Sequence, residues 1–201
     1  MRYYMLNKPR GCITACSDAR HATVMDLIPP AEREGLFPVG RLDKDTEGLL
    51  ILTDDGAFCN TLNSPCSRKT KTYRFYALGE CTEDALLRLE GGVEIPAIKN
   101  GLTAPAKARL LGTAALRDIA HLFDKSESVR LLHTRRGDRT VCHVELTVTE
   151  GKKHQVKRMA QAVGLTVVYL ERVAVCSLLL DPSLPRGAYR PLTDDELSLL
   201  M

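Results

Sequence analysis

The chain has 201 residues, of which 44% are hydrophobic and 26% charged, and its net charge is +3. This composition can bury a core, which excludes a disordered tail, and the length suits one domain of moderate size or two tightly joined halves. The sequence contains no apolar run near the roughly 20 residues that cross a bilayer, and residues 1–8 turn polar too early for a signal peptide. We therefore expect a cytoplasmic protein that does not enter a membrane.

The first half of the sequence predicts strands separated by turns and short helices. A strand at 3–6 stops at a turn, and a short helix is expected at 23–27. A polar loop at 40–48 leads into a continuous apolar strand at 49–53, and a helix follows at 57–62. A strand is predicted at 71–78, and the next helix begins after Thr82 and stops at Gly91.

The second half alternates in the same way. Signals are weak at 96–139, where we expect short strands and a helix near 116–123. Residues 141–148 alternate as a half-buried strand, and 153–163 have the apolar period of a helix. Strands are predicted at 166–170 and 173–180, and a capping box from Thr193 to Glu196 opens a last helix. The sequence therefore predicts one α+β domain over residues 1–201, with strands dominating.

Cysteines and charges limit the kinds of site. The seven cysteines have no repeated short spacing, which predicts free thiols and no zinc site. Basic residues cluster at 68–74, 130–139 and 152–158. Such clusters can neutralise phosphates although the total charge is small, or they can be ordinary solvated surface. Nucleic acid is therefore a candidate partner before any motif is considered.

The loop at 41–47 places four charged side chains directly before the apolar strand. Charge at the end of a buried strand must be solvated or functional. One interpretation is a surface loop with ion pairs between Arg41 and Asp45 and between Lys44 and Glu47. The other is a reactive loop, and the order of motifs along the chain favours it.

Five segments resemble one family in the same order. Residues 40–56 contain Gly-Arg-Leu-Asp, a second aspartate at 45, Gly-Leu-Leu and Asp-Gly. Around them lie Asn-Lys-Pro at 7–9, Lys-Thr-Tyr at 71–73, Glu-Gly-Lys-Lys-His-Gln-Val-Lys-Arg-Met at 150–159, and Leu-Glu-Arg-Val at 170–173 followed by Gly-Ala-Tyr-Arg-Pro-Leu-Thr at 187–193. These segments resemble the motifs of pseudouridine synthases, in the branch of ribosomal small-subunit synthase A and large-subunit synthases B, E and F. The match is weak between about 97 and 140.

The resemblance implies a mixed, mostly antiparallel sheet flanked by helices, with a central RNA-binding cleft. It implies an isomerase that converts uridine to pseudouridine in ribosomal RNA, with small-subunit RNA slightly favoured over large-subunit RNA. The uridine must be flipped out of the stack to react. No cofactor or metal is expected, and the partner is ribosomal RNA or a ribosomal assembly particle, bound by a monomer.

The resemblance also implies roles for particular residues. Asp43 is the catalytic aspartate, acting as nucleophile or as base. Tyr73 stacks on the target base, and Lys157 pairs with the aspartate and keeps it charged. Leu178 and Leu192 line the base pocket, although either could be plain core. The residues expected to contact RNA are Arg41, Arg68, Lys69, Lys71, Arg74, Lys152, Lys153, His154 and Arg158.

The sequence departs from the family pattern in two places. Many relatives carry an N-terminal RNA-binding domain of the S4 type, and we expect this chain to lack it. The charged segment at 112–137 is longer than in the usual pattern. It could be an RNA contact or a neutral surface insertion.

Two rival functions stay open at this point. One is a metal-dependent phosphohydrolase or nuclease that uses Asp43, Asp45, Asp54 and Asp55 as oxygen ligands. The other is a catalytically idle RNA-binding protein with the same fold.

Overall fold

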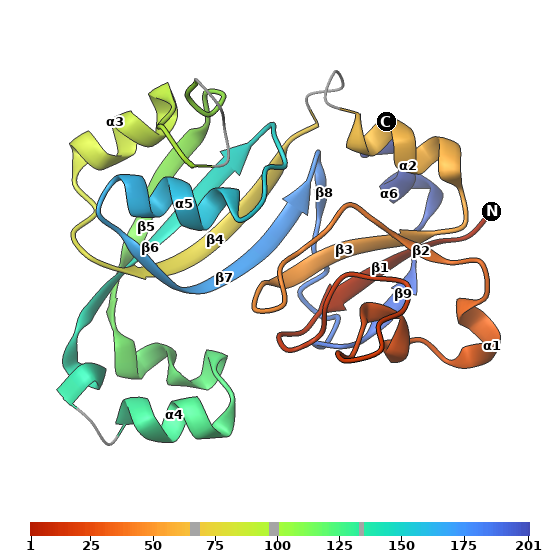
Figure 1. The fold of residues 1–201 in the computed structure, drawn as a ribbon, viewed down its shortest axis with the longest axis horizontal. Helices are drawn as coiled ribbons and strands as arrows, with labels where there is room; N and C mark the ends of the chain where they lie inside the picture. The colour runs from red at the N-terminus through yellow and green to blue at the C-terminus, as the bar shows by residue number, and fades with distance from the viewer. Residues whose placement is uncertain (65–68, 97–100, 133–134) are drawn as a thin grey trace. The chain divides into compact units, whose positions relative to one another are not determined.

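A computed structural model describes residues 1–64, 69–96, 101–132 and 135–201, and it divides the chain into two compact units (Figure 1). The first unit contains Met1–Thr72 and Glu171–Met201, and the second contains Tyr73–Leu170. The strands form mixed, mostly antiparallel sheet structure flanked by helices, as predicted. None of the helices in the described ranges is long and apolar enough to span a membrane.

The first unit is built mainly on antiparallel strand pairings. Strand β1 (Tyr3–Lys8) pairs antiparallel with both β3 (Glu47–Thr53) and β9 (Tyr189–Pro191), and β2 (Phe37–Val39) also pairs antiparallel with β3. The remaining elements of this unit are η1 (Val24–Leu27), α1 (Pro30–Arg33), α2 (Gly56–Asn63), β8 (Leu178–Leu179) and α6 (Asp194–Ser198).

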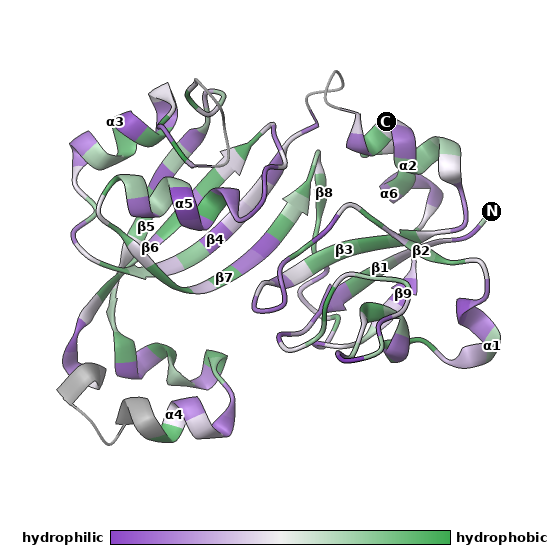
Figure 2. Cartoon of the chain, in the orientation of Figure 1, coloured by the Kyte–Doolittle hydropathy of each residue, from purple (hydrophilic) through white to green (hydrophobic). Residues whose placement is uncertain are grey.

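Strand β3 is the centre of the first unit's core. All seven of its residues are buried, and Figure 2 shows the strand as mostly hydrophobic. A strand covered on both faces needs such a continuous apolar run. Asp55 then ends the strand segment and caps α2, because its carboxylate accepts hydrogen bonds from the amides of Ala57 (2.9 Å) and Phe58 (3.0 Å).

The second unit has the sheet order β5-β6-β4-β7. Its elements in chain order are β4 (Lys71–Leu78), α3 (Glu83–Gly91), β5 (Lys107–Ala115), η3 (Leu116–Leu122), α4 (Lys125–Leu132), η4 (Arg135–Asp138), β6 (Thr140–Val148), α5 (Gln155–Ala162) and β7 (Thr166–Val175). Strand β4 begins in the first unit and β7 ends there. Helices α3 and α5 lie on one face of the strands (Figure 1).

Most predicted elements are present, with three corrections. The strands predicted at 166–170 and 173–180 are largely one ten-residue strand, β7, with the two-residue β8 after it. The helix predicted from 153 begins at Gln155, because His154 adopts a left-handed conformation (φ 54°) that cannot continue a helix. The segment near 116–123 is a 3-10 helix, and α4, which the sequence did not predict, follows it.

Candidate functional site

The loop between β2 and β3 holds Asp43 in a fixed turn. The Leu42 amide donates to Thr14 Oγ1 (3.1 Å), and that hydroxyl donates to the Leu42 carbonyl (2.8 Å). The Thr46 amide donates to the Asp43 carbonyl (3.1 Å). Leu42 is buried while Asp43 is half-buried. The backbone on both sides of Asp43 is therefore held, and its side chain keeps partial access to solvent.

Lys8, at the end of β1, ties the same loop to the core. Its side chain is fully buried, and its ammonium donates to the carbonyls of Pro9 (2.9 Å), Thr46 (2.9 Å) and, more weakly, Lys44 (3.5 Å). The Gly11 amide donates to the Lys44 carbonyl as well (2.8 Å). Three acceptors match the three N–H donors of a charged lysine.

Burial and nearby charge act on Lys8 in opposite directions. Burial lowers the pKa of Lys8, while electrostatic interactions with Cys12, Glu47, Asp45 and Asp43 oppose that shift. The loop thus lies against a buried cation whose charge the neighbouring carboxylates favour. The sequence marked Lys8 as part of a motif but predicted no role for it.

Arg172, on β7, is a second buried cation, which the sequence placed in a motif but gave no role. It is 2% exposed, and its Nε donates to the Leu49 carbonyl (2.8 Å). Gly48 lies opposite Arg172 in the parallel β3–β7 pairing and has φ +99°. A Cβ at Gly48 would lie 2.3 Å from the Arg172 carbonyl oxygen, so only glycine fits at the end of this loop.

Lys71 and Lys69 were predicted to contact RNA, and both are half-buried. Burial lowers the pKa of Lys71, and the charge of Arg172 lowers it further. The Lys71 ammonium donates to the Lys69 carbonyl (3.3 Å). The Lys69 ammonium donates to the carbonyls of Leu200 (2.9 Å) and Met201. Both ammonium groups therefore hold local structure, and their contact with RNA stays a prediction.

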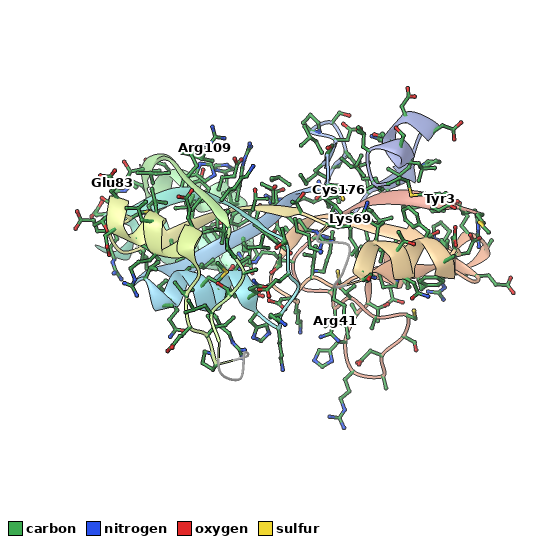
Figure 3. All side chains as sticks on the ribbon, turned by 90° about the horizontal axis from the view of Figure 1, so that it is seen from above. Tyr3, Arg41, Lys69, Glu83, Arg109 and Cys176 are labelled. Atoms are coloured by element: carbon green, nitrogen blue, oxygen red, sulfur yellow. The ribbon has the colours of Figure 1, made fainter. Side chains whose placement is uncertain are left out.

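The other predicted residues of the first unit fall into two groups. Arg41, labelled in Figure 3, is exposed on the Asp43 loop. Leu178 and Leu192 are 1% and 9% exposed and belong to the hydrophobic core that includes Met5 and Ile51. Arg68 lies outside the described residues.

In the second unit, the predicted residues gather at the start of α5 and on β4. Lys152, Lys153 and His154 are exposed, and Lys157 and Arg158 are half-buried. The buried Gln155 shapes this turn, because its side-chain oxygen accepts from the Lys152 amide (2.9 Å) and its amide donates to Glu150 (3.1 Å).

On β4, Tyr73 is half-buried and packs against the core of the second unit. Arg74 is exposed and pairs with Glu145 on β6 (2.9 Å). The predicted catalytic set thus has Asp43 in the first unit and Tyr73 and Lys157 in the second.

The surface-loop interpretation of residues 41–47 predicted a pair between Lys44 and Glu47. Glu47 is instead buried in β3 (3% exposed), where it forms an ion pair with Arg186 at 2.8 Å. This carboxylate belongs to the core of the first unit and not to a solvated loop.

The metal-dependent rival is not supported by the aspartates it requires. Asp54 accepts from the Arg2 amide (2.7 Å) and Nε (2.8 Å), and Asp55 caps α2. The seven residues of β3 separate this pair from Asp43 and Asp45 by about 20 Å of extended chain. In the described part of the chain, no three His, Cys, Asp or Glu side chains are grouped so as to hold a metal ion. The six described cysteines are free thiols, as predicted.

Comparison with known proteins identifies the family. The family model for RNA pseudouridylate synthase matches residues 2–162. An uncharacterized RNA pseudouridine synthase, YtzG, of Bacillus subtilis is 42% identical over 200 residues, which cover 98% of this chain and 72% of that protein. The ribosomal small subunit pseudouridine synthase A of Salmonella typhimurium is 34% identical over 197 residues, covering 98% of this chain and 73% of that one.

Solved structures agree with the sequence comparisons. A pseudouridylate synthase crystal structure is 33% identical, with a TM-score of 0.81, and the match covers 100% of this chain and 74% of that one. Human RNA pseudouridylate synthase domain containing 1 is 15% identical with a TM-score of 0.59, covering 98% of this chain and 90% of that one, and so shares the fold.

Proposed function

Because the chain belongs to the RNA pseudouridylate synthase family, and is therefore an isomerase that acts on RNA, we propose that it converts one uridine of ribosomal RNA to pseudouridine. Small-subunit RNA is the favoured substrate, since relatives named ribosomal small subunit pseudouridine synthase A match over 98% of the chain. We further propose Asp43 as the essential carboxylate. The observation that carries this assignment is the loop that Thr14 and Lys8 hold on either side of Asp43.

The reaction requires a carboxylate and no redox partner. The bond between N1 of uracil and C1′ of ribose breaks, and a bond from C5 to C1′ forms. The proton leaves C5 and N1 gains one, so atoms and electrons balance within the nucleotide. Asp43 acts as the nucleophile, or as the base that removes a ribose proton in a glycal route. Both routes need an ionised carboxylate in a fixed position, which the held loop supports.

The target uridine must leave its stack before either route can begin. We assign Tyr73 to stacking on the flipped base and Arg41 to the space that the base leaves. The exposure of Arg41 and the half-burial of Tyr73 are compatible with these roles. Leu178 and Leu192 remain candidates for the base pocket, although their core positions favour a packing role.

Lys157 is assigned as the cation that keeps the Asp43 carboxylate charged and oriented. A paired cation stabilises the charged form of a carboxylate. We assign contacts with the RNA phosphates to the basic side chains around the start of α5, because positive charges can neutralise phosphates. These side chains are Lys152, Lys153, His154 and Arg158. Arg68, from the 68–74 cluster, is assigned the same role.

The experiment uses the purified protein with small-subunit RNA, large-subunit RNA and particles assembled from each, followed by site-by-site mapping of pseudouridine. We expect conversion at one uridine of small-subunit RNA, free or in its particle. Conversion only in large-subunit RNA would contradict the choice of substrate, and no conversion in either ribosomal RNA or its particle would contradict the ribosomal assignment.

The role of Lys157 has its own test. Lys157→Arg keeps a cation and is expected to retain most of the single-turnover rate, whereas Lys157→Met should lower that rate. A Lys157→Met variant with the wild-type rate would show that another group positions Asp43.

A further inference from the structure

The strands of the second unit have one face that the helices leave open. The chain order β4-α3-β5-β6-α5-β7 with the sheet order β5-β6-β4-β7 is a split β-α-β arrangement. Both helices pack on the same face, through Ala85 and Leu89 of α3 and Val156 and Met159 of α5. Because side chains alternate along a strand, every second residue of β4 and β6 points to the opposite face.

This opposite face carries a fixed group of charges. Glu145 on β6 binds Arg74 on β4 (2.9 Å) and Arg109 on β5 (2.9 Å). The arginine side chains are 47% and 67% exposed, while Glu145 is 19% exposed. Figure 3 labels Arg109 at an outer surface of the molecule. One carboxylate therefore orients two guanidinium groups whose remaining N–H donors face solvent.

The charges leave this face positive. Lys107 lies on the same side of β5 as Arg109 and is exposed, so it adds a third cation to this face. Burial alone would raise the pKa of Glu145, but the hydrogen bonds and charges of Arg74 and Arg109 outweigh it and lower that pKa. Glu145 thus stays charged and keeps both arginines in place.

A stacked pair of rings lies beside the charges. Tyr76 on β4 and His143 on β6 have ring centroids 4.2 Å apart and planes inclined by 12°. Both rings are half-buried. Partial burial lowers the pKa of His143, and the charge of Arg74 lowers it further, so the imidazole is uncharged near neutral pH. The pair places two neutral, partly exposed aromatic rings next to exposed guanidinium groups.

One end of this face is already covered by the segment between β5 and β6. Leu116 and Ile119 of η3 pack with Val141, and Tyr76 packs against that cluster. Phe123 contacts the edge of Tyr169. This packing fixes the aromatic pair from one side, and the charged row of Arg74, Glu145 and Arg109 remains at the surface.

We propose that the face formed by Lys107, Arg109, Arg74, Glu145, Tyr76 and His143, the second-unit face, binds a single-stranded segment of RNA in addition to the target uridine. Single strands bind sheets through base stacking on aromatic rings, with cations on the phosphates. The charge favours this occupant, because protein interfaces are depleted of charged residues at their centre.

The first test measures binding of a fluorescent oligocytidine, which contains no uridine to react, by fluorescence anisotropy with the full chain. Arg109→Glu should weaken binding about tenfold at low salt and reduce the salt dependence by about one counterion. His143→Ala should weaken it about fivefold or more, as the loss of one stacking contact does. The matched control is Arg88→Glu on α3, an exposed position on the helix-covered side with the same change in charge. This variant also loses the hydrogen bond from Arg88 to the Ala162 carbonyl (2.9 Å), so its folding is checked by circular dichroism.

The second measurement uses the wild-type protein, so a folding defect cannot confuse it. Photo-cross-linking with an oligocytidine that contains 5-iodocytidine should attach RNA to the peptides with Tyr76 or His143. Cross-links confined to other peptides would overturn the proposal. The proposal would also be overturned if Arg109→Glu and His143→Ala bound the oligocytidine as tightly as Arg88→Glu does. A protein partner would then be the remaining candidate for the second-unit face.

Discussion

The substitution Lys8→Met isolates the contribution of the buried ammonium to the Asp43 loop. Methionine has a similar length and volume, so the side chain can fill the same space without creating a large cavity. The ammonium is lost, and with it the hydrogen bonds to the carbonyls of Pro9 and Thr46, each 2.9 Å long. The change therefore removes a tether and a charge and leaves the packing largely intact.

The expected loss of stability follows from these two carbonyls. A buried polar group that loses its partner costs about 1–3 kcal/mol, so two cost about 2–6 kcal/mol. Removing the desolvated charge of Lys8 offsets part of this. We expect the free energy of unfolding to fall by about 2–4 kcal/mol, a large share of the 5–15 kcal/mol typical of a domain.

The loss of activity should exceed what stability explains. With Thr46 released, the turn from Asp43 to Thr46 keeps the Asp43 carbonyl bond but loses its anchor to β1. A displaced catalytic group costs rate steeply, and we expect a fall of about tenfold or more under conditions where the variant is folded. Single-turnover conversion of RNA measures this rate, and urea unfolding measures the stability.

The pH dependence gives an independent check on burial. Burial lowers the pKa of Lys8 below its ordinary value of 10.5, so the unfolded chain holds the proton more tightly than the folded one. The stability of the wild type relative to Lys8→Met should therefore rise as the pH increases through the range just below 10.5.

The matched control is Lys44→Met in the same loop. The Lys44 side chain is exposed, and only its backbone carbonyl enters the network. We expect a change in stability below about 0.5 kcal/mol. If Lys8→Met were as stable and as active as Lys44→Met, the reasoning that Lys8 positions the loop would be refuted.

Two further substitutions test other parts of the fold. Gly48→Ala should destabilise the chain by about 3 kcal/mol or more, because its Cβ would lie 2.3 Å from the Arg172 carbonyl in a left-handed backbone conformation; a wild-type Tm in thermal unfolding would contradict this. Arg190→Met removes the hydrogen bonds (2.7 and 2.8 Å) that lower the pKa of Glu196 to about 2. The wild type should lose stability as the pH falls from about 4.5 to about 2, and the variant should lose less over that interval in acid unfolding; equal losses would contradict the assignment.

The elements with a clear period were predictable from the sequence. In β6, Cys142, Val144, Leu146 and Val148 all lie in the core, as their alternation predicted. In α5, Val156 and Met159 are buried while Lys157 is half-buried, in agreement with the helical period. Such patterns are predictable because each of these elements packs one face against one core, and the spacing of the apolar residues shows which face that is.

The buried cations were not predictable in the same way. The acceptor of Lys8 at Thr46 is 38 residues away, and the acceptor of Arg172 at Leu49 is 123 residues away. A charged residue in an apolar strand signals that some partner exists, but the partner is a backbone carbonyl that the sequence does not mark. The sequence could therefore mark these two positions as unusual but could not predict their hydrogen-bond partners.

The segment between β5 and β6 shows another reason why prediction from the sequence was incomplete. Its charged composition left open an RNA contact or a neutral insertion, and neither interpretation predicted that Leu116 and Ile119 pack with Val141. Short 3-10 helices such as η3 lack the period of an α-helix, so their apolar residues are difficult to recognise. The sequence located the segment and missed how it packs.

The central claim, that Asp43 drives the modification of one ribosomal uridine, is tested most directly in cells that lack this gene. The pseudouridines of ribosomal RNA are mapped in the deletion strain and after return of the wild type, Asp43→Asn or Asp45→Asn. Asp45 is the matched control, an exposed aspartate two positions along the same loop. We predict that one small-subunit site disappears on deletion, returns with the wild type and with Asp45→Asn, and stays absent with Asp43→Asn. Restoration of that site by Asp43→Asn, or persistence of every ribosomal site in the deletion strain, would contradict the account.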